Sequence, residues 1–156
     1  MLQYIIGIDP GQQGGIAVFN TENQTIKAYN MPETFPDIFD LINTFVMEHG
    51  SANVVAYMEN VGHGIPNQSS SATAKFGRHN GHLEMALYAC GIRTEMVTPQ
   101  KWQKFYSNDL GKSSEYEKRE WKNRLKGLAQ RLYPSCKVTL NTADAILLAH
   151  YGSKHV

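Results

Sequence analysis

Asp9 stands where an apolar run ends and a glycine-rich turn begins. The run YIIGI precedes it, and PGQQGG follows it before a second apolar run, IAVF. A carboxylate at the end of a buried strand is costly to desolvate unless a cation meets it. Glycines in the turn would let a metal ion or a phosphate approach the backbone closely. Aspartate is also favoured in turns, so a plain β-hairpin explains this segment equally well.

Two further acids occupy comparable positions on other apolar elements. Glu59 ends the run VVAYME, and Asp144 lies in the first turn of a predicted helix whose face it shares with Asn141. Carboxyl ends of neighbouring parallel strands meet at one edge of a sheet, so we expect Asp9 and Glu59 to be close. Three such carboxylates repel one another unless cations lie between them, and hard oxygen ligands suit Mg²⁺ or Mn²⁺. Each acid also has a simpler explanation, because Glu59 could start a loop and Asp144 could stabilise a helix N-terminus.

Hydrophobic periodicity predicts the elements that position these acids. In chain order it gives strands over 2–9, 15–20 and 24–30, a helix over 35–49, a strand over 53–59, a helix over 71–90, a strand over 92–97, a short helix over 99–106, a loop over 107–116, a helix over 117–132, a strand-like segment after Pro134 and a helix over 141–151. Short connections favour an antiparallel meander for the first three strands, and right-handed crossovers follow. We therefore expect an α/β protein with a mixed five-stranded sheet and helices on both faces.

The composition is that of a globular protein. The chain has 156 residues, of which 42% are hydrophobic and 19% charged, which fits a single domain over 1–156. Two cysteines without CxxC spacing give no disulfide framework and favour a reducing compartment. The sequence shows neither a signal-peptide pattern nor an apolar run of about 20 residues, so we expect a cytoplasmic protein without membrane contact. The first part of the chain is acidic and the second basic, which suggests an anionic partner.

Four sequence blocks follow one another along nearly the whole chain: GIDPGQQGGIAVF, YMEN, ATAKFGRHNG and TADAILLAHYG. Together they resemble the RuvC-type Holliday junction resolvases, and more specifically the short RuvC-like nucleases of bacteriophages. The resemblance implies an RNase H-like fold, in agreement with the strand order above. It also implies an endonuclease that nicks four-way (Holliday) and other branched DNA junctions symmetrically, by two-metal phosphodiester hydrolysis. A phage-encoded protein would act in the cytoplasm of a bacterial host.

The resemblance carries the metal-binding and catalytic roles onto Asp9, Glu59 and Asp144, with two Mg²⁺ or Mn²⁺ ions per site and no small-molecule cofactor. Asn141 occupies the position of a fourth ligand, where the family usually has Asp or His. An amide oxygen can bind a hard metal but brings no charge, so this substitution would weaken one of the two metal positions.

The basic residues of the second half are the expected contacts to branched DNA: Lys75, Arg78, Lys101, Lys104, and a stripe of Lys118, Lys122 and Lys126. Such contacts position a duplex without reading its sequence. A solvated helix face explains the stripe equally well.

Related enzymes act as homodimers. Ala72, Leu83 and Leu87 on the 71–90 helix are candidates for the interface, although core packing explains them as well. In RuvC enzymes an aromatic residue of the loop after the second acid enters the junction, whereas loop 60–70 offers only Ile65 and Pro66 as apolar residues.

Three other functions fit parts of the pattern. An RNase H-fold nuclease acting on structured RNA also begins with a strand followed by Asp-Pro-Gly. A sugar-kinase or actin-like ATPase has a similar phosphate loop, but it needs two such lobes, and 156 residues are too few for both. A non-catalytic junction-binding protein would tolerate asparagine at position 141.

Overall fold

A computed structural model describes residues 1–62 and 67–156 of the chain. Ile65 and Pro66, the apolar candidates of the loop after Glu59, lie outside the described residues. The element order is β1 (Tyr4–Asp9), β2 (Gly15–Asn20), β3 (Ile26–Asn30), α1 (Phe35–His49), β4 (Val54–Glu59), α2 (Ser70–Ala89), β5 (Arg93–Val97), α3 (Pro99–Phe105), α4 (Ser107–Leu110), α5 (Lys118–Leu132) and α6 (Ala143–Ser153), with single 3₁₀ turns at Ser51–Asn53 and Ser113–Glu115.

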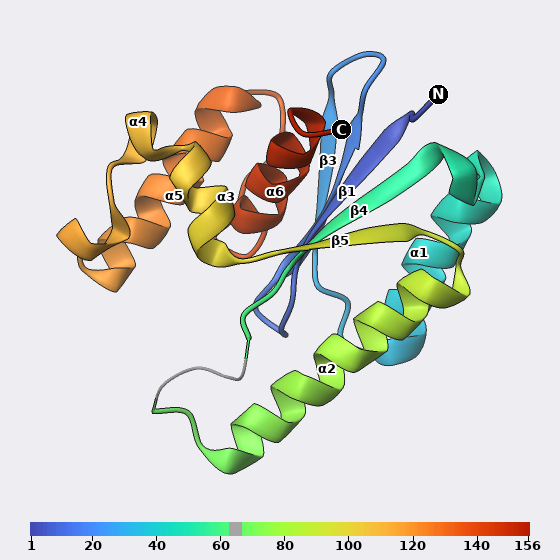
Figure 1. Cartoon of the computed structure of the whole chain (residues 1–156), viewed down its shortest axis with the longest axis horizontal. Coiled ribbons are helices and arrows are strands. Elements are labelled where there is room, and N and C mark those ends of the chain that lie inside the picture. Colours follow the sequence, from blue (N-terminus) through green and yellow to red (C-terminus); the bar gives the residue numbers. More distant parts are fainter. Residues whose placement is uncertain (63–66) are drawn as a thin grey trace.

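The strands form one five-stranded sheet in the order β3-β2-β1-β4-β5 (Figure 1). β2 pairs antiparallel with both β1 and β3, whereas β4 pairs parallel with both β1 and β5. The predicted mixed sheet is therefore confirmed, and β1 and β4 are its parallel central pair. Among the described helices, none is long and apolar enough to cross a bilayer.

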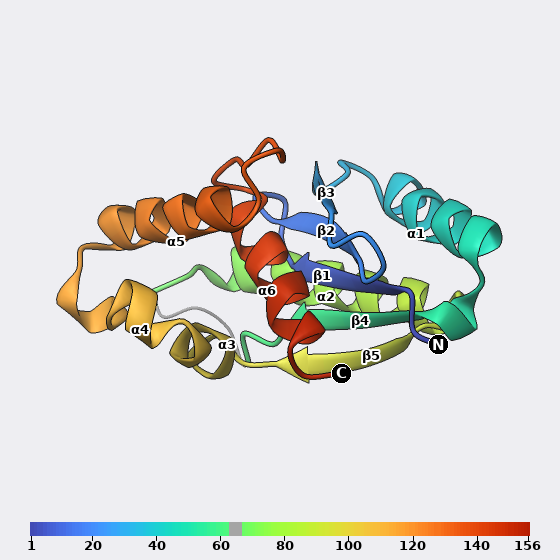
Figure 2. The ribbon, with the colours of Figure 1, turned by 90° about the horizontal axis from the view of Figure 1, so that it is seen from above.

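Alternation along β1 and β4 divides the core between the two faces of the sheet. Ile6, Ile8 and Met58 pack on the face covered by α1 and α2, and Ile5 and Tyr57 pack on the face covered by α3, α5 and α6 (Figure 2). Successive strand residues point to opposite faces. Asp9 and Glu59 consequently point to the same face as Ile5 and Tyr57, toward α6.

Helix α6 lies directly on β1 because Gly7 has no side chain. A Cβ atom at Gly7 would collide with the Ala145 carbonyl oxygen and would lie 2.5 Å from the Ala149 nitrogen. Most of α6 is buried, since eight of its 11 residues lie in the interior. This close approach fixes the distance between the first turn of α6 and the end of β1.

Two predictions about the second half of the chain were wrong. Residues 107–116 contain the short helix α4, which forms because Leu110 is buried against the core. Among the described residues after Pro134 no strand forms, and Val138 is buried from an irregular segment instead.

Candidate metal centre

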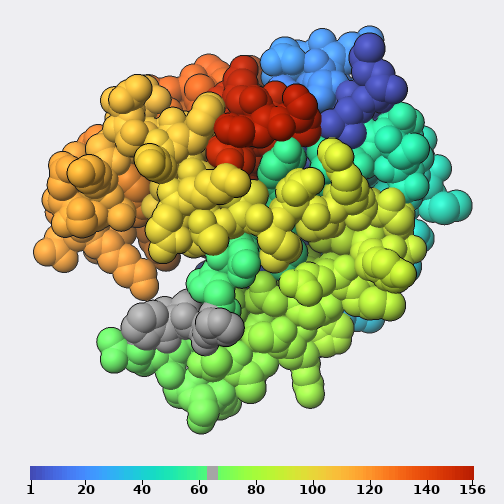
Figure 3. Space-filling model, viewed as in Figure 1, coloured from blue at the N-terminus to red at the C-terminus, as the bar shows by residue number. Residues whose placement is uncertain are grey.

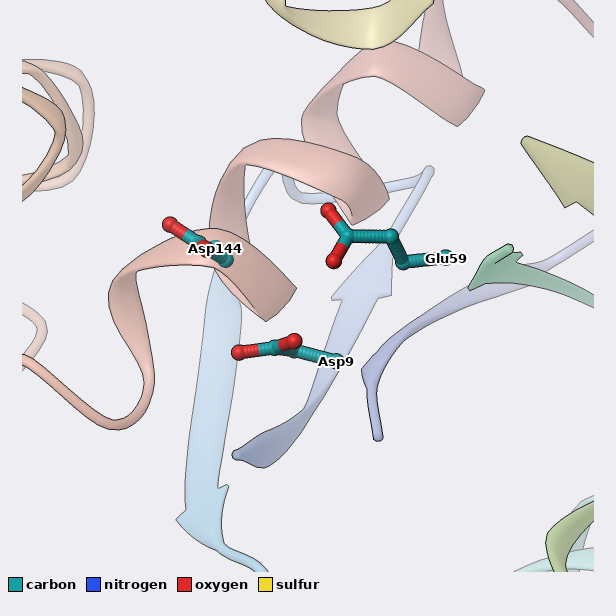
Figure 4. Close-up of side chains that lie close together, drawn as sticks. All are labelled: Asp9, Glu59 and Asp144. Carbon is teal, nitrogen blue, oxygen red and sulfur yellow. The ribbon is translucent and has the colours of Figure 1, made fainter. Parts of the chain in front are cut away.

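Three carboxylates meet where β1, β4 and α6 converge. The parallel register pairs Ile8 with Met58, so Asp9 and Glu59 follow at the same level on adjacent strands. Asp144 lies in the first turn of α6 and faces them (Figure 4). One oxygen from each of the three side chains lies within 4.8 Å of the others. The expected cluster of acids is thus present.

Burial and mutual repulsion make this cluster unfavourable without a cation. The pKa of Asp9 is raised well above its usual 3.8, first by burial and then by the charges of Asp144 and Glu59. Burial and the charge of Asp144 raise the pKa of Glu59 to about 7, and burial raises that of Asp144 to about 6. A divalent ion would remove this repulsion and satisfy the carboxylate oxygens, so the donor set fits Mg²⁺ or Mn²⁺.

Trp102 of α3 is a partner of the cluster that the sequence did not reveal. Its indole Nε1–H donates a hydrogen bond of 2.7 Å to Glu59 Oε2, and the whole side chain is inaccessible to solvent. A buried indole generally needs an acceptor. The sequence motif TPQKW does predict a helix start with Trp102 on its buried side, but nothing in the sequence selects Glu59 as its acceptor.

Of the three lysines in the predicted stripe, Lys122 of α5 is the one whose charge acts on the acids. Its ammonium group lowers the pKa of both Asp9 and Asp144, against the larger effect of burial. Lys122 is nevertheless solvent-exposed, and so is Lys118, while Lys126 is partly buried. The predicted stripe therefore has one member at the acids.

The other predicted DNA contacts lie on exposed surface. Lys75 and Arg78 project from the first half of α2, and Lys101 and Lys104 from α3. Phe76 of α2, which stands between Lys75 and Arg78 in the sequence, lies beside the turn after Asp9. A Cβ atom added at Gly11 in that turn would be 3.5 Å from the Phe76 ring. The start of α2 therefore runs close to the carboxylates.

The surface is open around this part of the sheet. A cavity of about 270 Å³ is lined by residues of the segment after β4, of α2 and of β5, among them Asn60, Phe76, Asn80 and Met96. Figure 3 shows the outline of the molecule notched between α5 and the start of α2, on the side toward which β1 and β4 point. The cavity adjoins Asn60, the residue after Glu59, but none of the three acids lines it.

The spacing of Asn141 and Asp144 predicted that they share a helical face, and the structure contradicts this. Helix α6 begins at Ala143, and Asn141 belongs to the turn before it. Thr139 and Thr142 stabilise this turn, since the Thr142 hydroxyl accepts a 3.0 Å hydrogen bond from the Thr139 main-chain N–H. A Cβ atom at Gly15 would lie 2.7 Å from the Asn141 carbonyl oxygen, so the turn packs against the start of β2.

Two of the three residues considered for a dimer interface are core residues. Leu83 and Leu87 are 0% and 1% exposed and pack between α2 and the sheet. The exposed apolar side chains of α2 are Met85 and Tyr88 instead, at 62% and 79%. For Leu83 and Leu87 the alternative explanation, core packing, is therefore the right one.

Comparison with known proteins gives structural matches only. No profile of a known protein family matches the chain, and no curated protein sequence is significantly similar to it. The RuvC structure of Thermus thermophilus superposes with a TM-score of 0.58 at 15% identity, over 97% of this chain and 96% of that one. Thermus thermophilus RuvC in complex with a Holliday junction substrate gives a TM-score of 0.60 at the same identity and coverage. The arrangement of sheet, covering helices and carboxyl-end acids thus belongs to a chain with the RNase H-like fold of RuvC.

Proposed function

We propose that this protein is a metal-dependent endonuclease that nicks four-way DNA junctions, and other branched DNA, symmetrically. The observation that carries the proposal is the cluster of Asp9, Glu59 and Asp144, whose oxygens lie within 4.8 Å of one another at the end of the central strands. A protein gains nothing in stability from three buried like charges, so their proximity points to cation binding. The fold shared with RuvC, solved in complex with a Holliday junction, supports DNA as the substrate.

The three carboxylates would bind two Mg²⁺ or Mn²⁺ ions, with Asn141 as a further candidate ligand from the turn before α6. Divalent ions held in this way activate water for attack on a phosphodiester and stabilise the charge of the leaving oxygen. The chain itself holds Asp9 and Glu59 in register on a rigid parallel pair, and α6 holds Asp144 against them. Lys122 adds one positive charge beside the acids, where it would attract the scissile phosphate.

The basic side chains of α2, α3 and α5 would hold the phosphates of the arms: Lys75, Arg78, Lys101, Lys104, Lys118, Lys122 and Lys126. Two symmetric nicks require two sites, which a homodimer would supply. Met85 and Tyr88 on the outer face of α2 are the apolar candidates for its contact surface.

Cleavage of end-labelled DNA tests the proposal. The protein is mixed with Mg²⁺ or Mn²⁺ and with a synthetic four-way junction, a flap, a linear duplex or a structured RNA. We expect paired nicks in the junction and loss of cleavage, with junction binding retained, in Asp9→Asn and Glu59→Gln. Glu22→Gln, in the exposed β2–β3 turn, is the matched control and should cleave normally.

Other outcomes would replace the proposal. Cutting confined to RNA would make the protein a ribonuclease of the same fold. Binding of the junction without nicks at any metal concentration would make it a structural junction-binding protein. A Glu59→Gln variant that cuts at the wild-type rate would remove the carboxylate cluster from the mechanism.

A further inference from the structure

Helix α3, which carries the Trp102 indole to Glu59, is anchored at both of its ends. Helix α3 begins at Pro99, and the Thr98 hydroxyl accepts a hydrogen bond from the Lys101 main-chain N–H, which fixes its first turn. At its other end Tyr106 donates a 2.7 Å hydrogen bond to the Leu147 carbonyl oxygen of α6. These two contacts hold α3 in place and thereby position the Trp102 indole beside Glu59.

The requirement of a buried indole for an acceptor does not by itself explain this bond. Trp121 also buries its Nε1–H, and in the part of the chain that the structure describes it has no hydrogen-bond partner. The fold thus tolerates one unpaired buried indole, yet it directs the other onto a carboxylate of the candidate metal centre. Any main-chain carbonyl would have satisfied Trp102 without taking up an oxygen of that centre.

We propose that Trp102 is a positioning residue that occupies Glu59 Oε2 and leaves Oε1 as the oxygen for a metal ion, which favours Mg²⁺ or Mn²⁺ over Ca²⁺. A glutamate that binds through both oxygens is typical of Ca²⁺ sites, which accept six to eight oxygens in flexible geometry. Mg²⁺ requires near-octahedral geometry with shorter bonds and is satisfied by one oxygen from each carboxylate. This inference rests on the proposed metal centre, but it concerns ion choice and not the reaction.

The wild-type protein carries its own reporters for the first part of the test. It has two tryptophans, so a ¹H–¹⁵N correlation NMR spectrum shows two indole N–H signals. The signal that disappears in Trp121→Phe belongs to Trp121, and the other belongs to Trp102. The Trp102 signal is expected at the lower field because its proton lies on a carboxylate. Addition of Mg²⁺ should shift this signal and leave that of Trp121 in place. An unmoved Trp102 signal in a protein that binds Mg²⁺ would overturn the inference.

Calorimetric titration of Trp102→Phe provides the second part. Phenylalanine keeps an aromatic ring but has no N–H, so Glu59 regains its second oxygen. We expect the ratio of Ca²⁺ affinity to Mg²⁺ affinity to rise about tenfold over wild type, the scale of one hydrogen bond to a charged group. Trp121→Phe is the control and should keep the wild-type ratio. An unchanged ratio in Trp102→Phe refutes the inference, and the NMR result stands even where this variant does not fold.

The two proposals fail in different ways. A protein that binds Mg²⁺, shows the Trp102 shift and the altered ratio, yet cuts no nucleic acid, supports the role of Trp102 and refutes the nuclease. A protein that cuts junctions with an unchanged ion ratio in Trp102→Phe refutes only the role of Trp102. A protein that binds no divalent ion refutes both.

Discussion

Neutralising Glu59 should make the metal-free protein more stable at alkaline pH. Burial and the charge of Asp144 raise the pKa of Glu59 from 4.5 to about 7. Between these values the folded protein holds the Glu59 proton more tightly than the unfolded chain does. Stability therefore falls as the pH rises through this window, and the loss is complete above the folded pKa.

The size of the effect follows from the shift. A rise from 4.5 to about 7 corresponds to about 3 kcal/mol at pH 8, at about 1.4 kcal/mol per pKa unit. Glu59→Gln carries no charge at any pH, and its amide oxygen can still accept from Trp102. We expect this variant to unfold at pH 8 with a free energy about 2–3 kcal/mol higher than wild type, and to gain less than about 1 kcal/mol at pH 5.

Urea denaturation in EDTA at pH 5 and pH 8 measures both differences. Glu22→Gln, with its exposed side chain, should match wild type at both pH values. A gain of the same size at pH 5 and pH 8 would show that the variant stabilises through packing and not through charge. A loss of stability at pH 8 would refute the view that the carboxylates repel one another in the folded state.

Three further predictions concern the surroundings of the cluster. Gly7→Ala should destabilise the protein by several kcal/mol, on the order of a severe overpacking in the core, and reduce Mg²⁺ affinity, because the new Cβ atom collides with the backbone of α6. Addition of Mg²⁺ at about 100 times its dissociation constant should raise the unfolding free energy by about 2.7 kcal/mol in wild type and by far less in Asp9→Asn. Lys75→Gln and Arg78→Gln should each lower the slope of log affinity for a four-way junction against log salt by about 0.9.

Each of these outcomes has a clear opposite. A Gly7→Ala protein as stable as wild type by urea denaturation would mean that α6 does not rest on β1. Equal Mg²⁺ stabilisation of Asp9→Asn, followed by thermal unfolding, would place the ion elsewhere. Salt slopes from filter binding that do not change would show that the start of α2 makes no phosphate contact.

The sequence was sufficient for those features that depend on local pattern. The strand periodicity of β1, β2 and β4, together with the short turns between them, predicted the mixed sheet. The same pattern placed Asp9 and Glu59 at one edge, since parallel neighbours end together. Features that depend on distant packing were missed. The segment predicted as a loop forms α4, in which Leu110 is buried, and the indole of Trp102 donates a hydrogen bond to Glu59, which is distant in the sequence.

The position of Asn141 shows the same limit at the scale of one helical turn. A spacing of three residues predicts a shared face only if both residues lie in the helix. Here Thr139 and Thr142 form a hydrogen-bonded turn, and α6 begins only after this turn, at Ala143. Hydroxyl side chains compete locally with helical hydrogen bonds, and their choice of partner depends on the packing of the segment.

The dependence of the cluster on α6 also has a consequence for the stage of synthesis at which the candidate metal centre can form. Asp9 and Glu59 are in place once β1 and β4 have paired, but Asp144 is translated much later, on a helix that packs directly against β1. A nascent chain, or a fragment that stops before α6, carries an incomplete set of acids and an uncovered sheet face. Such a fragment cannot complete the candidate metal centre, so under the proposed function unfinished copies of the protein would not cut DNA.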